Sequence, residues 1–119
     1  MKNIDLVSLN KDIETFVQER DWDKFHSLKN LSIALSVESS ELLEIFQWLS
    51  EEEAAKITQD PEKFQKVQDE VADIFVYLLR IVSKTNMDLE AAVKSKMKKN
   101  GAKYPVELAR GNAKKYDEF

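Results

Sequence analysis

Glycine and proline are scarce in this chain, and that scarcity limits the folds it can adopt. Only two residues of each type occur among 119. Both types supply the tight turns that a sheet of many short strands needs, so we expect long regular elements and few connections. A chain of this length can bury one core of ordinary size, which predicts a single domain over residues 1–119. The expected fold class is all-α.

Apolar residues recur at helical spacing in four segments. The predicted helices cover about residues 6–20, 28–49, 61–84 and 89–101. Their expected N-caps include Ser27, Asp60 and Asp88. Gly101 is predicted to end the last helix, and the spacing of Ser50 and Glu53 predicts a short helix between the second and third. Residues 21–26 read as an aromatic loop, so the pattern predicts a bundle of four helices.

Composition excludes several classes of protein. The chain has no cysteine, which excludes disulfides, thiolate metal sites and a cysteine nucleophile. A net charge of -4 gives no basic surface for a nucleic-acid polymer. No apolar run has the length of a membrane span or a signal peptide. We therefore expect a soluble, unprocessed, cytoplasmic protein that binds neither a nucleic-acid polymer nor a membrane.

Two acids interrupt the apolar stripe of the helix at 28–49. Glu38 and Glu41 are three residues apart and therefore share one face. The apolar members of that face are Leu31, Ala34, Ile45 and Trp48. A carboxylate drawn toward a core is disfavoured unless a cation accompanies it. The position of these two acids therefore calls for a cation.

A second acid pair repeats this spacing on the helix at 61–84. Glu70 and Asp73 lie at the margin of its apolar face, and two such pairs on facing helices can surround one ion. Oxygen ligands alone favour Mg²⁺, with Mn²⁺ as a substitute, over zinc. The competing interpretation is a solvated face paired with neighbouring basic residues. Those residues are Lys63, Lys66, Arg80 and Lys84, and spacing alone leaves both interpretations open.

An acidic signature in two parts and three further motifs, four motifs in all, resemble a known family. ESSELLEIFQW at 38–48 followed by DEVAD at 69–73 is similar to the acidic signature of the all-α nucleotide pyrophosphohydrolases, the MazG-like superfamily. ERDWDKFH at 19–26, SKMKKN at 95–100 and KYP at 103–105 are most similar to its dCTP pyrophosphatase branch. The resemblance covers roughly residues 10–116. It implies an all-α pyrophosphatase fold.

The resemblance also implies a reaction and a set of residues. A (deoxy)nucleoside triphosphate, dCTP or a related dNTP, would be hydrolysed to the monophosphate and pyrophosphate, with Glu38, Glu41, Glu70 and Asp73 as magnesium ligands. We expect Glu41 to be the general base, helped by Glu44. The residues implied to contact the substrate are Trp22, His26, Trp48, Tyr77, Lys96, Asn100 and Tyr104. Trp22 and Trp48 would flank the base, while Lys96, Asn100 and Tyr104 would reach phosphate or sugar.

Two further expectations concern partners and alternatives. Four long helices in a small chain have limited means to cover every apolar stripe, and the resemblance implies a homodimer or homotetramer that completes the bundle. The competing function is a non-enzymatic helical module whose acidic face binds a basic partner. A di-iron carboxylate bundle is set aside because its sites pair glutamate with histidine, and the chain has only His26.

Overall fold

A computed structural model describes all 119 residues, and its regular elements are helices throughout. It divides into two compact units, Met1–Thr85 and Asn86–Phe119, which we describe separately. The first unit contains α1 (Leu6–Glu19), α2 (Leu28–Phe46), α3 (Glu51–Ala55) and α4 (Pro61–Thr85), and the second contains α5 (Leu89–Lys103) and α6 (Val106–Ala109). The predicted all-α class is confirmed.

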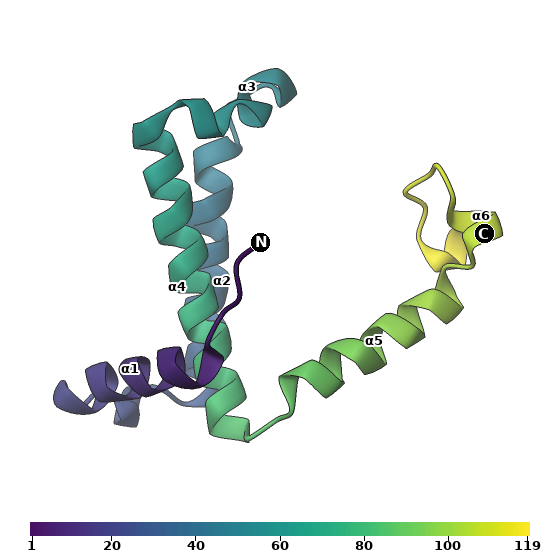
Figure 1. Cartoon of the computed structure of the whole chain (residues 1–119). Coiled ribbons are helices and arrows are strands. Elements are labelled where there is room, and N and C mark those ends of the chain that lie inside the picture. Colours follow the sequence, from purple (N-terminus) through teal and green to yellow (C-terminus); the bar gives the residue numbers. More distant parts are fainter. The chain divides into compact units, whose positions relative to one another are not determined.

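An antiparallel pair of helices forms the centre of the first unit. Helices α2 and α4 lie side by side along their length, and α1 crosses them near the end where α2 begins (Figure 1). Helix α3 lies at the opposite end, in the connection between α2 and α4. Because the chain reverses between α2 and α4, one face of each helix is turned toward the other.

Local caps set the starts of these helices as the sequence predicts. The Ser27 hydroxyl accepts a hydrogen bond from the Asn30 amide at 3.1 Å. Ser50 and Glu53 form a complete capping box, with bonds of 3.1 and 3.0 Å in the two directions. Asp60 accepts from the Lys63 amide at 3.1 Å, directly before Pro61. Each cap satisfies an amide that has no partner within its helix.

Helix α1 ends in a turn that places the aromatic loop. Asp21 takes a left-handed conformation with φ of 52°. Its amide donates to the Gln18 carbonyl, and the Trp22 amide donates to the Val17 carbonyl, each at 3.0 Å. This pattern is a Schellman motif with aspartate where glycine is usual. Trp22 therefore leaves the helix at a fixed point, and residues Asp23–Phe25 continue as a single 3₁₀ turn.

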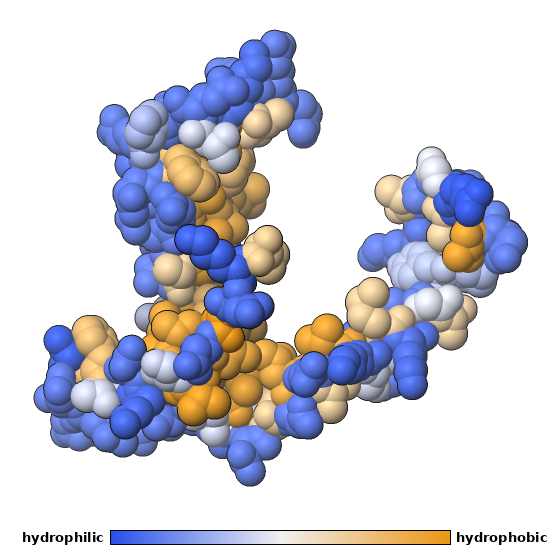
Figure 2. Space-filling view, in the orientation of Figure 1, coloured by the Kyte–Doolittle hydropathy of each residue, from blue (hydrophilic) through white to orange (hydrophobic).

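The first unit buries few apolar side chains. Only Val17, Leu31 and Leu79 are buried apolar residues. In Figure 2 apolar surface gathers where α1 meets α4, and a cavity of about 700 Å³ lies there with walls that include Leu9, Phe64 and Val71. None of the helices combines the length and the apolar character that crossing a membrane would need.

The second unit is built on α5. The Asp88 carboxylate accepts from the Ala91 amide at 2.9 Å and so caps the start of the helix, as predicted. Beyond α6 the chain folds back, and Tyr104 makes edge contacts with Tyr116 and Phe119 at ring distances of 6.2 and 5.9 Å. These aromatic contacts hold the end of the chain against the end of α5.

Two predicted helix ends were wrong. Helix α2 ends at Phe46 rather than Leu49, because Ser50 must take an extended conformation to cap α3 and the chain has to turn before it. Helix α5 continues through Gly101 to Lys103. A glycine inside an exposed helix costs only about 1 kcal/mol, so the effective stop is Pro105, which disfavours helical backbone at the residue before it.

Candidate metal centre

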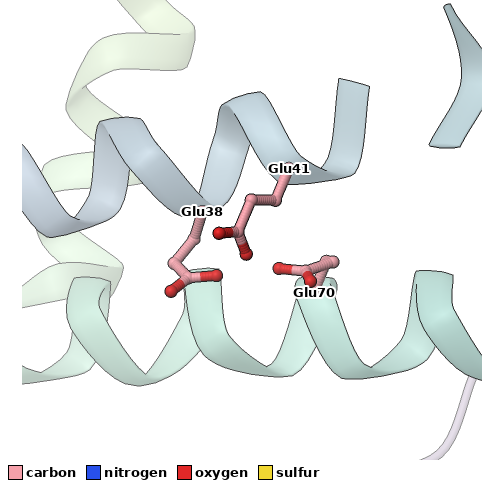
Figure 3. Close-up of side chains that lie close together, drawn as sticks. All are labelled: Glu38, Glu41 and Glu70. Carbon is pink, nitrogen blue, oxygen red and sulfur yellow. The ribbon is translucent and has the colours of Figure 1, made fainter. Parts of the chain in front are cut away.

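Three carboxylates from two helices meet in the first unit. Glu38 and Glu41 project from α2 and Glu70 from α4, with their carboxyl groups turned toward one another (Figure 3). One oxygen of each lies within 4.8 Å of the others. The three-residue spacing on α2 and the antiparallel packing of α4 against it produce this arrangement. The structure thus brings together three of the four predicted acids.

The cluster lacks the partners that carboxylates normally have. Glu38 Oε2 and Glu70 Oε2 are buried and form no hydrogen bond. Burial, contacts with Glu70 and Glu41, and nearby negative charge raise the pKa of Glu38 to about 7. The pKa of Glu70 is also raised: its contact with Glu38 acts to lower it, but burial and the charges of Glu41 and Asp73 outweigh this. A cation would remove both the repulsion and the unmet hydrogen-bonding capacity.

The interpretation of Glu70 and Asp73 as a salt-bridged face is not supported. Neither acid has a basic group within 4.0 Å, since the ion pairs of the chain all involve other carboxylates. Arg80 and Lys84 instead bind Asp23, at 2.8 and 3.0 Å. The donor set of the cluster is oxygen alone, which suits a hard divalent cation.

Asp73 lies beside the cluster rather than in it. Its side chain is exposed and is not among the three whose oxygens meet. Its negative charge nevertheless contributes to raising the pKa of Glu38. The same charge contributes to raising the pKa of Tyr77, although burial and the charge of Glu38 contribute more. Asp73 is therefore near enough to the cluster to influence it electrostatically without belonging to it.

An aromatic cavity of about 480 Å³ opens beside Asp73. It is lined by Asp12, Ile13, Phe16, Val17, Trp22, His26, Asp73, Val76 and Tyr77. The Trp22 and Phe16 rings form a T-shaped contact at a centroid distance of 5.8 Å and an angle of 76°. The predicted substrate residues Trp22, His26 and Tyr77 thus share one cavity with a predicted ligand of the metal.

A second cavity contains basic and acidic side chains together. Its volume is about 420 Å³, and its walls are Glu41, Glu44, Ile45, Lys63, Lys66, Asp69 and Glu70. Glu41 and Glu70 belong to this cavity and to the carboxylate cluster. Three of the four predicted acids therefore line cavities of different chemistry: Glu41 and Glu70 line the charged cavity, and Asp73 lines the aromatic one.

Four other predicted residues are not among those that line these two cavities. Trp48 is 87% exposed and follows the end of α2, whereas Trp22 precedes its start. The 19 residues of α2 span about 28 Å, so the two rings cannot flank one base within one chain. Lys96 and Asn100 lie on α5 and Tyr104 at its C-cap, all in the second unit. Their role in the site stays a prediction.

Sequence reasoning missed one polar network at the aromatic cavity. Arg80 donates to Asp23 at 2.8 Å and to His26 Nδ1 at 3.3 Å, across more than fifty residues of sequence. One signal was available: Arg80 follows Leu78 and Leu79 and precedes Ile81, so it is a charge within an apolar run. Its partners could not be identified without the structure.

Comparisons with known proteins agree with this geometry. The profile of the MazG-like family matches residues 33–119. dCTP pyrophosphatase 1 of Rattus norvegicus is 42% identical and that of Homo sapiens 40%, each over 104 residues or 87% of this chain. The chain spans 61% of the length of each. A pyrophosphatase crystal structure from Archaeoglobus fulgidus superposes with a TM-score of 0.78 at 36% identity, covering 88% of this chain and 96% of that one.

Proposed function

Because the chain belongs to the MazG-like family, we propose that it is a magnesium-dependent hydrolase that converts a deoxynucleoside triphosphate, dCTP first, to the monophosphate and pyrophosphate. Membership confirms the family predicted from the four sequence motifs. The observation that carries the activity is the cluster of Glu38, Glu41 and Glu70, with two buried oxygens unpaired beside an aromatic cavity. The names of the relatives motivate dCTP as the first substrate.

The proposed metal ligands are the three clustered glutamates and Asp73, with Mn²⁺ able to replace Mg²⁺. When bound, the ion supplies positive charge to phosphate oxygens and acidifies water. Glu41 is our proposed general base, because its side chain faces both the cluster and the charged cavity. Glu44 lies in the wall of that cavity and is proposed as its helper.

We place the nucleobase in the aromatic cavity. A volume of about 480 Å³ lies within the usual range for small-molecule sites, roughly 300–1,000 Å³. Trp22 packs against Phe16 in a T-shaped contact and is 44% exposed, which leaves surface on which a base can stack. The triphosphate would then extend past Asp73 toward the clustered glutamates.

Trp22→Ala is expected to raise the KM for dCTP by about fivefold or more, because stacking on an aromatic ring contributes about 1–3 kcal/mol per base. The kcat should change little, since the carboxylates are untouched. Steady-state kinetics gives both values. Phe25→Ala is the matched control, because Phe25 is 58% exposed in the same loop and lines neither cavity. Equal KM values for the two variants would contradict this placement.

The charged cavity suits the pyrophosphate end of the substrate. Lys63 and Lys66 are its only basic groups, and neither forms an ion pair with a carboxylate. Hydrogen bonds from charged donors to phosphate contribute about 1.5–3 kcal/mol. Because Lys63 and Lys66 are not paired with a carboxylate, their ammonium groups are available to bind the phosphates of the substrate.

Replacing Lys63 and Lys66 together with methionine is expected to raise the KM for dCTP by about tenfold or more. Methionine keeps most of the length and apolar stem of lysine while removing its charge. Lys56→Met serves as the control, because Lys56 pairs with Glu52 on the exposed side of α3 and lines neither cavity. A double variant with the kinetics of the native chain would show that the pyrophosphate lies elsewhere.

We also propose that the chain assembles into a homodimer or homotetramer. Three buried apolar side chains are few for a chain of this size, and the apolar cavity between α1 and α4 offers surface for a second copy. Assembly would also let Trp48 of one copy reach the aromatic cavity of another. Light scattering after gel filtration should give two or four times 13.8 kDa, and Val71→Glu, in the cavity wall, should lower that mass. A monomer at micromolar concentration would refute the assembly.

A substrate panel tests the proposed function. The full chain is incubated with each natural dNTP and Mg²⁺, and pyrophosphate and phosphate are measured separately. The proposal requires pyrophosphate, fastest from dCTP, and no phosphate. Turnover that persists in EDTA would contradict the dependence on a metal, and unchanged turnover in Asp73→Asn would exclude Asp73 from the ligand set.

A further inference from the structure

Arg80 is the one charged residue that is almost fully buried, with 4% of its surface exposed. Its terminal nitrogen donates to the Asp23 carboxylate at 2.8 Å, and its Nε donates to His26 Nδ1 at 3.3 Å. Asp23 is held a second time by Lys84 at 3.0 Å. The guanidinium plane is therefore fixed by two partners from the aromatic loop, which joins α1 to α2.

The direction of the Arg80–His26 hydrogen bond determines where the histidine proton lies. An arginine Nε–H can only donate, so Nδ1 of the imidazole has to be the unprotonated nitrogen. In a neutral ring the proton is then on Nε2. His26 Nε2 forms no hydrogen bond within the chain, and His26 lines the aromatic cavity. The free polar edge of the ring is thus a donor.

We propose that Arg80 is a positioning residue that fixes His26 as its Nε2–H tautomer, so that His26 offers one hydrogen-bond donor to an acceptor atom of the nucleobase. The inference deepens the proposed function and rests on it for the identity of the ligand. A donor at this place selects a carbonyl oxygen or an unprotonated ring nitrogen, as on the edge of a pyrimidine. An amino group facing His26 would meet no acceptor.

The surroundings of the ring agree with a neutral histidine. Burial, followed by the charges of Arg80 and Lys84, lowers the pKa of His26, and only Asp23 acts in the opposite direction. The other charged groups of the cavity wall are Asp12 and Asp73. The neutral imidazole is therefore favoured, and in that form the contact with Arg80 persists because Nδ1 remains an acceptor.

The first part of the test is spectroscopic and needs no substrate. His26 is the only histidine in the chain, so a long-range ¹H–¹⁵N correlation spectrum of the ¹⁵N-labelled full chain reports its two ring nitrogens alone. We expect a protonated Nε2 and an unprotonated Nδ1 at pH 7.5. Arg80→Met should populate the Nδ1–H tautomer as well, whereas Lys84→Met should not, because Lys84 touches Asp23 but not His26. A protonated Nδ1 in the native chain would overturn the proposal, as would identical spectra for native chain and Arg80→Met.

The second part is kinetic. Arg80→Met and Arg80→Lys should each raise the KM for dCTP about five- to tenfold, the effect of one hydrogen bond, with little change in kcat. In a His26→Phe background the Arg80 substitutions should add no further increase, because the effect passes through His26. Additive increases would show that Arg80 acts by another route. If Arg80→Met does not fold, the kinetics of Arg80→Lys and the spectrum of the native chain still test the role of Arg80. An absence of turnover in the native chain would refute the proposed function, but the tautomer of His26 could still be measured.

Discussion

Replacing Glu38 with glutamine is expected to reduce the kcat for dCTP by more than about a hundredfold and, at the same time, to stabilise the metal-free protein at neutral pH. Glu38 is central to the carboxylate cluster, with Glu41 and Glu70 within 4.8 Å and one oxygen buried without a partner. Glutamine keeps its shape but removes a charged ligand of the proposed metal. A loss of this size corresponds to about 3 kcal/mol of transition-state stabilisation.

The gain in stability follows from the pKa of Glu38. The value rises from 4.5 to about 7 on folding, so the folded state binds more protons than the unfolded state between these values. Stability of the metal-free native protein must then fall as pH rises from 4.5 to about 7, and the cost is fully present above 7. Glutamine does not ionise, so the Glu38→Gln variant avoids this loss of stability. At this half-buried position, after allowance for screening by solvent, the gain is about 1 kcal/mol.

Thermal unfolding in EDTA at pH 8 and at pH 4 measures this effect. Glu38→Gln should unfold at a higher temperature than the native chain at pH 8 and at the same temperature at pH 4. With Mg²⁺ in excess the native chain should gain stability and the variant should not, because only a state that binds the ion is stabilised by it. Glu51→Gln, an exposed residue of α3, is the control. A native chain as stable as Glu38→Gln in EDTA at pH 8 would show that the cluster is not under strain.

Leu31→Ala should have the largest effect on stability, about 2–4 kcal/mol. Leu31 is 1% exposed and is the only large side chain buried so completely. Its loss leaves a cavity where α2 packs against α4, and few other buried apolar side chains are available to compensate. Because the same two helices hold the glutamates, kcat should fall as the variant begins to unfold. Denaturant titration gives the change in the free energy of unfolding.

Ile33→Ala on the same helix is the matched control. Ile33 is 52% exposed, so its truncation should cost less than about 1 kcal/mol. If both substitutions cost the same, Leu31 is not the centre of the core and the packing of α2 against α4 differs from that described.

The starts of the helices could be predicted because they depend on neighbours in sequence. Ser27, Asp60 and Asp88 each accept a hydrogen bond from an amide three residues later. The ends were harder to predict. A glycine such as Gly101 permits a helix to stop but does not require it, and the turn after Phe46 depends on how much chain the reversal toward α4 needs. These are properties of packing rather than of local sequence.

The acid pairs of the site were predictable from spacing, but their relation to the other residues was not. Periodicity places Glu38 and Glu41 on one face, and only the packing of α2 against α4 shows that Glu70 joins them while Asp73 lies at the side. The Arg80–His26 contact joins residues 54 apart. The family resemblance implied that Trp22 and Trp48 flank one base, yet α2 keeps them apart within one chain. Contacts between distant segments depend on a fold that the spacing of residues does not specify.

The dependence of pyrophosphate release on Mg²⁺ can be measured by ³¹P NMR of dCTP with the full chain, first in EDTA and then after addition of Mg²⁺. We expect no change in EDTA and, after Mg²⁺ is added, equal amounts of dCMP and pyrophosphate, with neither dCDP nor phosphate. Native chain that leaves dCTP intact in Mg²⁺, or that releases phosphate, would contradict this expectation.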